Sequence, residues 1–356
     1  MEEKKKFKLG LLPKLIIAII IGILFGQFLP EGFCRFVVTL SSFFSQFLSF
    51  IIPLMILAYV TMGIANLKSG AGRLLLITVA LAYCSTLIAG SASFFVSDTL
   101  FPHFMSADAL DRIAATAGNS LEPYFSLEIP ALMNTLSAVV LAFVLGIGMA
   151  NLKGDSMLKV FRDLQNIVSG VLRHVIIPLI PVHIAGLFAN ISAEGRLAAT
   201  VKMFASLYAI IIVLQLLYIL SQFLLASGVC RKNHLKSIKN VAPAYFTALG
   251  TQSSASTIPV ALNCAYSNNV NRDVADFVVP LCATINLNGD TICLVLGSMG
   301  IMLASGMNPT LAVFAPFILM LGVTMVAAPG VPGGGVMAAL GLITSMLGFT
   351  DPMQQL

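Results

Sequence analysis

A polar stretch within a long apolar run places the tightest constraint on how this chain can fold. The run extends from about Phe277 to Leu303, and a helix needs about 20 apolar residues to cross a bilayer. Inside the run lies TINLNGD, from Thr284 to Asp290. A carboxylate and two amides at that depth are costly unless each has a partner or a water-filled cavity. Because Gly289 also lets a helix open, the stretch predicts an interrupted helix that carries a transport site.

The composition indicates an integral membrane protein. Hydrophobic residues make up 58% of the chain and charged residues 10%, against about 25% charged in a soluble domain. The net charge of +5 falls in loops, where it sets orientation, so no nucleic-acid partner is expected. The six cysteines have no metal-binding spacing, so we expect no transition-metal site and no cofactor. An intramembrane enzyme would need a base near Ser253 or Ser254, and because no His or Lys is predicted at that depth, we expect no enzyme.

Basic residues fall in every second loop between the apolar runs. This alternation predicts a multi-pass protein of the cell membrane, with a cytoplasmic N-terminus and six spans before Arg231. The loops expected outside contain Glu31, the segment from Asp98 to Glu122, and Glu194. The loops expected inside contain Lys68 and Arg73, then Lys153, Lys159 and Arg162, then Arg231, Lys232, Lys236 and Lys239.

Two segments are too interrupted to be simple spans. Val241–Ala265 has basic residues on both flanks, so both of its ends belong in the cytoplasm and the segment must enter the membrane and return. Pro309–Gly348 contains AAPGVPGGG, whose prolines and glycines prevent a stable helix, and no basic residue borders it. We interpret both segments as re-entrant hairpins that enter from opposite sides. A Ser-rich cytoplasmic linker and a kinked span are the respective alternatives.

Four motifs, in the same order along the chain, resemble those of one family. TQSSASTIPV is similar to the family's Ser-rich first hairpin tip, ATINLNGD to its seventh-helix motif, GVPGGG to its second hairpin tip, and LLPKLIIAIIIGILFG to its first helix. The chain therefore resembles the dicarboxylate/amino acid:cation symporters, which include the glutamate transporters. The resemblance extends over the whole chain.

The resemblance implies an all-α integral membrane fold, an inverted-repeat transporter with two re-entrant helical hairpins and a broken seventh helix. It also implies a homotrimer, in which residues 1–73 and 122–198 supply scaffold helices 1 and 2, then 4 and 5. Residues 74–121 would hold helix 3 and an external loop, and residues 199–356 would hold helix 6, hairpin 1, helix 7 and hairpin 2. Helix 3 and residues 199–356 would form a transport domain that crosses the membrane as an elevator, with the hairpins as gates.

The same resemblance implies a set of binding residues. The substrate would contact both hairpin tips and the end of the seventh-helix motif, and a coupling cation, expected to be sodium, would bind among oxygens around that motif. The substrate-binding residues would be Gln252, Ser253, Ser254, Asp290, Val331, Pro332 and Gly333. The cation-binding residues would be Cys282, Thr284, Asn286, Leu287, Asn288, Met325, Val326 and Ala328, with the helix-3 hydroxyls of Ser85 and Thr86 beside the Asn286 side chain.

The chain departs from the family pattern in three places. Asn288 replaces the usual Asp of the seventh-helix motif and Asp290 the usual Thr, which moves the carboxylate two residues along the chain. Gln252 stands where some members have Arg. The family's eighth helix, with its substrate-binding Arg, would begin after Leu356, so we expect a truncated chain with impaired transport.

The function implied is secondary active symport by an elevator mechanism. Inward cation flux, expected to be sodium, would drive uptake of an acidic amino acid or dicarboxylate. A neutral amino acid or cystine is the alternative substrate. A non-transporting membrane assembly subunit is the alternative of another class.

Overall fold

The computed structural model describes most of the chain, and its regular structure is helical. No β-strand is present among the described residues, which are 11–66, 72–104, 123–125, 127, 129–133, 135–152, 154–193, 195, 197–231, 233–326, 328, 334–349 and 353. The helices are α1 (Leu11–Phe28), α2 (Glu31–Asn66), α3 (Gly72–Phe104), α5 (Thr135–Asn151), α6 (Ser156–Val171), the π-helical turn η1 (Leu172–Ile176), α7 (Ile177–Ala193), α8 (Leu197–Cys230), α9 (His234–Thr251), α10 (Ser254–Ser267), α11 (Arg272–Ile285), α12 (Asn288–Ala304), α13 (Leu311–Val326) and α14 (Gly334–Leu347).

Several of these helices are long and apolar enough to span a bilayer. Within the described part of the chain, five helical stretches meet both conditions: Glu31–Ala65, Arg73–Phe101, Ser156–Ala193, Phe204–Cys230 and Arg272–Ala304. Each is at least as long as the roughly 20 residues that a bilayer core requires. A helix satisfies all of its own backbone hydrogen bonds, which an apolar solvent demands. The chain is therefore a multi-pass membrane protein.

One group of packed helices comprises α1, α2, α5, α6 and α7. α1 lies along α7, and a Cβ at Gly22 or Gly26 would overlap the Ala185 or Ala189 carbonyl, respectively, of α7. Small residues four apart let two helix backbones approach closely in this way. α2 packs on α5, α6 and α7.

A second group comprises α3, α8, α12, α13 and α14, together with α9, α10 and α11 beside them. α12 and α13 both pack on α3, α8 packs on α12, and α13 packs on α14. The core of this group contains fully buried side chains from α12 and α13, including Leu296, Phe314, Phe317 and Leu321. α14 also packs on α2 and α5 of the first group, where Met337 is buried among α2 side chains such as Met55. α14 therefore touches both groups.

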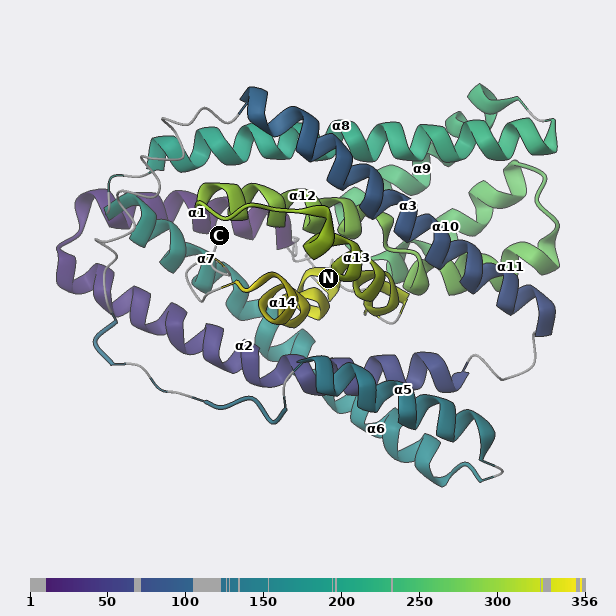
Figure 1. Ribbon diagram of the computed structural model, residues 1–356, viewed down its shortest axis with the longest axis horizontal. Helices are drawn as coiled ribbons and strands as arrows, with labels where there is room; N and C mark the ends of the chain where they lie inside the picture. Colours follow the sequence, from purple (N-terminus) through teal and green to yellow (C-terminus); the bar gives the residue numbers. More distant parts are fainter. Residues whose placement is uncertain are drawn as a thin grey trace, which may run out of the picture.

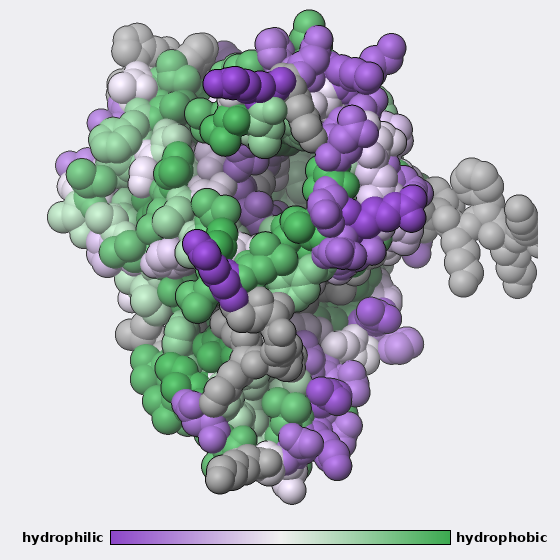
Figure 2. All heavy atoms as spheres, turned by 90° about the vertical axis from the view of Figure 1, so that its right-hand side faces the viewer, coloured by the Kyte–Doolittle hydropathy of each residue, from purple (hydrophilic) through white to green (hydrophobic). Residues whose placement is uncertain are grey.

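Basic residues gather at one end of the molecule. Figure 1 shows that α3 begins, α8 ends and α11 begins at the same end, and these termini carry Arg73, Arg231 and Arg272. Figure 2 looks onto this end, where hydrophilic residues border a hollow in the surface. Because basic loops stay in the cytoplasm, we predict that this end faces the cytoplasm.

Thiol labelling on intact cells tests this orientation. In a variant free of the six native cysteines, His234→Cys is expected to resist an impermeant thiol reagent and Asp108→Cys to react with it. His234 is the exposed first residue of α9, whereas position 108 lies outside the described residues. Permeabilised cells provide the control, since both positions should react there. Preferential labelling of position 234 in intact cells would reverse the topology.

Candidate functional site

The helix that carries TINLNGD is interrupted, as its sequence predicts. α11 ends at Ile285 and α12 begins at Asn288, while Asn286 (φ −124°, ψ 77°) and Leu287 (φ −101°, ψ 51°) have non-helical backbone. The backbone N–H of Asn286 still donates to the Cys282 carbonyl at 3.1 Å. Such breaks turn backbone carbonyls towards a bound ion or substrate in transporters.

A closed hydrogen-bond network fixes the start of α12 to α3 and α8. The Asn288 side-chain amide donates to Ser85 Oγ at 2.8 Å, and Thr86 Oγ1 donates to Asn288 Oδ1 at 3.1 Å. Gln222 Nε2 also donates to Ser85 Oγ at 2.8 Å. Tyr218 Oη lies 2.9 Å from Ser85 Oγ and donates to the Ser85 carbonyl at 2.6 Å.

The protons around Ser85 can be assigned, whereas the Thr86 hydroxyl has two acceptors within reach, Asn288 Oδ1 and the Ala82 carbonyl at 2.9 Å. Because the Tyr218 hydroxyl donates to the Ser85 carbonyl, Ser85 Oγ must donate to Tyr218 Oη. Ser85 Oγ then accepts from Asn288 and Gln222, which uses its one donor and two acceptor positions. The network is uncharged, and the Ser85 hydroxyl has no free lone pair for a cation in this arrangement.

Sequence reasoning did not identify the residues that α8 contributes. Gln215 Nε2 donates to the Gly289 carbonyl at 3.0 Å, one residue after Asn288. Gln215, Tyr218 and Gln222 are spaced three and four apart, which puts them on one face of α8. Polar side chains at this spacing in an otherwise apolar 34-residue helix are the signal that would have found them.

The Asn286 side chain holds a buried acceptor without a partner. Asn286 Oδ1 is buried and has no hydrogen bond in the part of the chain that the structure describes. The Thr284 hydroxyl bonds to the Leu281 carbonyl at 2.8 Å, and the Leu287 carbonyl accepts from the Thr291 amide and hydroxyl, each at 3.1 Å. A buried unpaired oxygen needs an explanation, and a coordinated cation is one. Oxygens at the break therefore suit a hard cation such as sodium.

Asp290 lies between the starts of two helices. It is in the first turn of α12, and a Cβ placed on Gly335, the second residue of α14, would overlap its carboxylate. Unpaired backbone N–H groups make a helix N-terminus partly positive, so a carboxylate is stabilised there.

The first predicted hairpin is a pair of packed helices joined by a tight turn. α9 and α10 pack together on either side of Gln252, which has a left-handed backbone (φ 51°), and Ser253, whose side chain accepts from the Ser256 amide at the start of α10. Ser254 is the first residue of α10. α9 packs on α8, and α10 packs on α11.

The second predicted hairpin is described on both sides of its tip. α13 packs on α14, and the buried Met325 lies one residue before Val326, which ends α13. Ala328, just beyond α13, is also buried. The predicted substrate residues Val331, Pro332 and Gly333 lie outside the described residues.

The structure brings some of the predicted residues together. Ser85 and Thr86 meet the Asn288 side chain, whereas the sequence had placed them beside the Asn286 side chain. Asp290 meets the start of α14, as expected if the seventh helix and the second hairpin share a site. The turn at Gln252 joins α9, which packs on α8, to α10, which packs on α11. The predicted roles of these residues in binding stay predictions.

Comparison with known proteins identifies the family. The model of the sodium:dicarboxylate symporter family matches residues 11–356, so the chain belongs to this family. It is also similar to proteins named serine/threonine transporter SstT from three strains of Acinetobacter baumannii. Each is 26% identical over 341 residues, which cover 93% of this chain and 84% of the relative.

These findings confirm the resemblance and bear on the substrate. The family supports symport of a small molecule across a membrane. The relatives are named for serine and threonine, which are neutral amino acids.

Proposed function

We propose that this protein couples inward sodium flux to the uptake of a neutral amino acid of the size of serine or threonine. The charge balance around the interrupted helix is the observation that carries the proposal. Asp290 places a carboxylate at the start of α12 and α14, and the sequence from Asp273 to Leu356 contains no Lys or Arg. The name of the A. baumannii relatives supports the same class of substrate.

A dicarboxylate fits this arrangement poorly. Two negative charges next to Asp290 would repel it, and at an effective dielectric constant of 20 one such pair at 4 Å costs about 4 kcal/mol. After Arg272 at the start of α11, the seventh helix and second hairpin contain no Lys or Arg in compensation. A neutral amino acid carries an ammonium group that can pair with Asp290, and its single carboxylate can face a sodium ion or the N-termini of α10 and α14.

The coupling cation would bind at the break in the helix. Asn286 Oδ1 supplies a buried oxygen with no partner among the described residues, and the Cys282 carbonyl, which accepts from the Asn286 backbone N–H, keeps a second lone pair. The Leu287 carbonyl already accepts from the Thr291 amide and hydroxyl, so it would have to release one of them to bind the cation. Met325, Val326 and Ala328 at the end of α13 would complete the ligands, with Thr284. Asn288 would hold the break in place through Ser85 and Thr86 rather than lend a charge.

The packing of the helices suits an elevator movement. α1, α2, α5, α6 and α7 form the first group and would be the scaffold of a homotrimer, while α3 and α8–α14 would be the moving transport domain. α9–α10 and α13–α14 would be the two re-entrant hairpins, with their tips at Gln252–Ser254 and Val331–Gly333 on the substrate. Because α14 touches both groups, it would slide on α2 and α5 as the domain moves.

Ligand binding to the purified protein tests the substrate class. In lipid nanodiscs with sodium, serine and threonine are expected to raise the unfolding temperature, because a ligand that binds only the folded state stabilises it. Aspartate, succinate and cystine should have no effect at the same concentrations, and potassium in place of sodium should remove the effect of serine. Stabilisation by aspartate alone would show instead that the substrate is an acidic amino acid. No stabilisation by any of these ligands would favour a non-transporting assembly subunit.

A further inference from the structure

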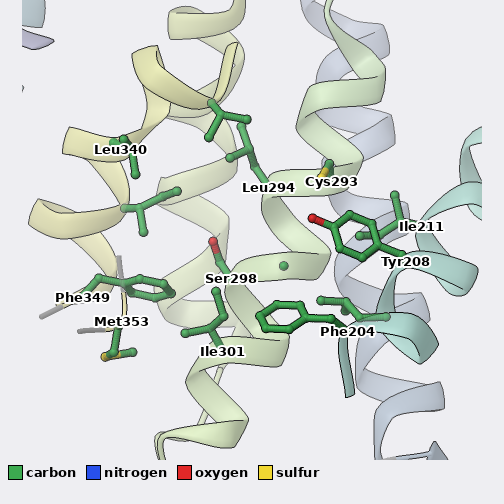
Figure 3. Close-up of a pocket in the computed structure, with 14 residues that line it drawn as sticks. Phe204, Tyr208, Ile211, Cys293, Leu294, Ser298, Ile301, Leu340, Phe349 and Met353 are labelled. Carbon is green, nitrogen blue, oxygen red and sulfur yellow. The ribbon is translucent and has the colours of Figure 1, made fainter. Parts of the chain in front are cut away.

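A cavity of about 200 Å³ lies beside α12. α8, α12 and α14 line it, and Phe349 and Met353 lie at its edge (Figure 3). Most of its lining is apolar, with side chains such as Phe204, Leu294 and Leu340. Among the described residues, none of those that line it is charged. An apolar cavity of about 150 Å³ holds a benzene molecule, so this one has room for a ring with a small substituent.

Two hydroxyl groups face this apolar space. Figure 3 shows the oxygens of Ser298 and Tyr208 directed into the gap between the helices. Ser298 is only 3% exposed and Tyr208 is 54% exposed, and both line the cavity. A polar group on a bound molecule can pair with a hydroxyl that faces the cavity, and such a hydrogen bond contributes about 0.5–1.5 kcal/mol.

Gly297 of α12 also lines the cavity and has open space beside it. A Cβ at Gly297 would meet no atom within 4 Å, although its neighbour Ser298 is buried. Gly297 lines the cavity seven residues after Asp290, a distance of about 10 Å along the helix axis. Cys293, three residues after Asp290, and Val336, next to Gly335, extend the lining towards Asp290.

We propose that this cavity binds a small uncharged molecule that combines a ring with one hydroxyl group, such as a simple phenol. The ring fills the apolar volume, and the hydroxyl pairs with Ser298 and Tyr208. An ion is excluded because an isolated charge in such surroundings is strongly disfavoured. Tyr208 is 54% exposed on α8, so the molecule would enter from the bilayer beside it.

A bound molecule would restrain the second hairpin. It touches α14 on one side and α8 and α12 on the other, so its contacts are lost if α14 moves away from α12. If α14 has to move during transport, the molecule inhibits uptake. This inhibition rests on the proposed function, whereas binding to the cavity does not.

Fluorine NMR with para-fluorophenol tests the binding, with the protein in nanodiscs. The native protein is expected to give saturable line broadening. Gly297→Leu should weaken binding at least tenfold, because its side chain fills the cavity. Gly228→Leu is the matched control, since Gly228 lies on α8 away from the cavity and also has no atom within 4 Å of an added Cβ. Ser298→Ala, which changes the volume very little, should weaken binding by several-fold.

Two results of the binding experiment would overturn the proposal. Equal broadening for the native protein and Gly297→Leu would mean that the probe only partitions into lipid. No saturable binding by the native protein would mean that acyl chains or side chains fill the space. If the protein transports serine, para-fluorophenol should inhibit uptake over the same concentrations at which it binds, and Gly297→Leu should resist inhibition. Failure of transport itself would leave the binding comparison intact and would count against the proposed function alone.

Discussion

Asp290→Asn is expected to lower sodium-dependent uptake at least tenfold, equivalent to about 1.4 kcal/mol. The substitution keeps the shape of the side chain and removes its charge. That charge lies in the first turn of α12 and against the start of α14, close to the proposed sites of sodium and of the substrate ammonium. A carboxylate in a membrane-spanning segment is expensive, and binding of a cation is the function that best accounts for it.

Asp273→Asn is the matched control for this change. Asp273 is also in the first turn of a helix, α11, but it is exposed at the basic end of the molecule. The control should keep native uptake and native sodium dependence. Native behaviour of Asp290→Asn in the same assay would reduce Asp290 to a structural residue.

A double substitution checks that the effect comes from the contact with α14. Gly335→Ala should destabilise the protein, because the new Cβ overlaps the Asp290 carboxylate. Asp290→Gly in the same chain removes that carboxylate, so it should cancel most of the destabilisation. Additive effects on the unfolding temperature would mean that the two residues are not in contact.

Ser85→Ala is expected to destabilise the second group of helices by about 2 kcal/mol or more. The Ser85 hydroxyl accepts from Asn288 and Gln222 and donates to Tyr218, so its loss leaves two amide donors without a partner. Each unsatisfied buried donor costs about 1–3 kcal/mol. Because the network fixes the start of α12, apparent sodium affinity should fall as well.

Ser93→Ala is the control, because it removes a buried serine hydroxyl that lies outside the network. Ser93 is on the same helix and fully buried, but its hydroxyl bonds only to the Ala89 carbonyl of its own helix. Its replacement should therefore shift the unfolding temperature very little. Equal shifts for Ser85→Ala and Ser93→Ala, measured in nanodiscs, would contradict the role assigned to the network.

The interrupted helix was the most predictable part of the site. TINLNGD puts a glycine and three strongly polar side chains into an apolar run, and the interruption at Asn286 and Leu287 follows from that local conflict. The all-helical fold was equally predictable, because apolar runs of this length have few alternatives in a bilayer. Both features depend on residues close together in the sequence.

The partners of the polar residues could not be predicted in the same way. Asn288 meets Ser85 across 203 residues, and Tyr218 meets Ser85 across 133. The spacing of Gln215, Tyr218 and Gln222 marks a polar face of α8, but which helix that face meets depends on how the whole group packs. The contact of Asp290 with Gly335 likewise depends on where α14 begins after the second hairpin.

Accumulation of serine by proteoliposomes tests the central claim most directly. The chain extended by an eighth helix would be reconstituted with sodium outside and choline inside, beside the 356-residue chain, which is expected to be impaired, and radiolabelled serine would be followed over time. The account predicts that serine rises inside above its external concentration, that aspartate does not compete, and that a sodium ionophore abolishes the accumulation. Serine that never exceeds its external concentration, or that enters equally well without a sodium gradient, would contradict sodium-coupled transport of a neutral amino acid.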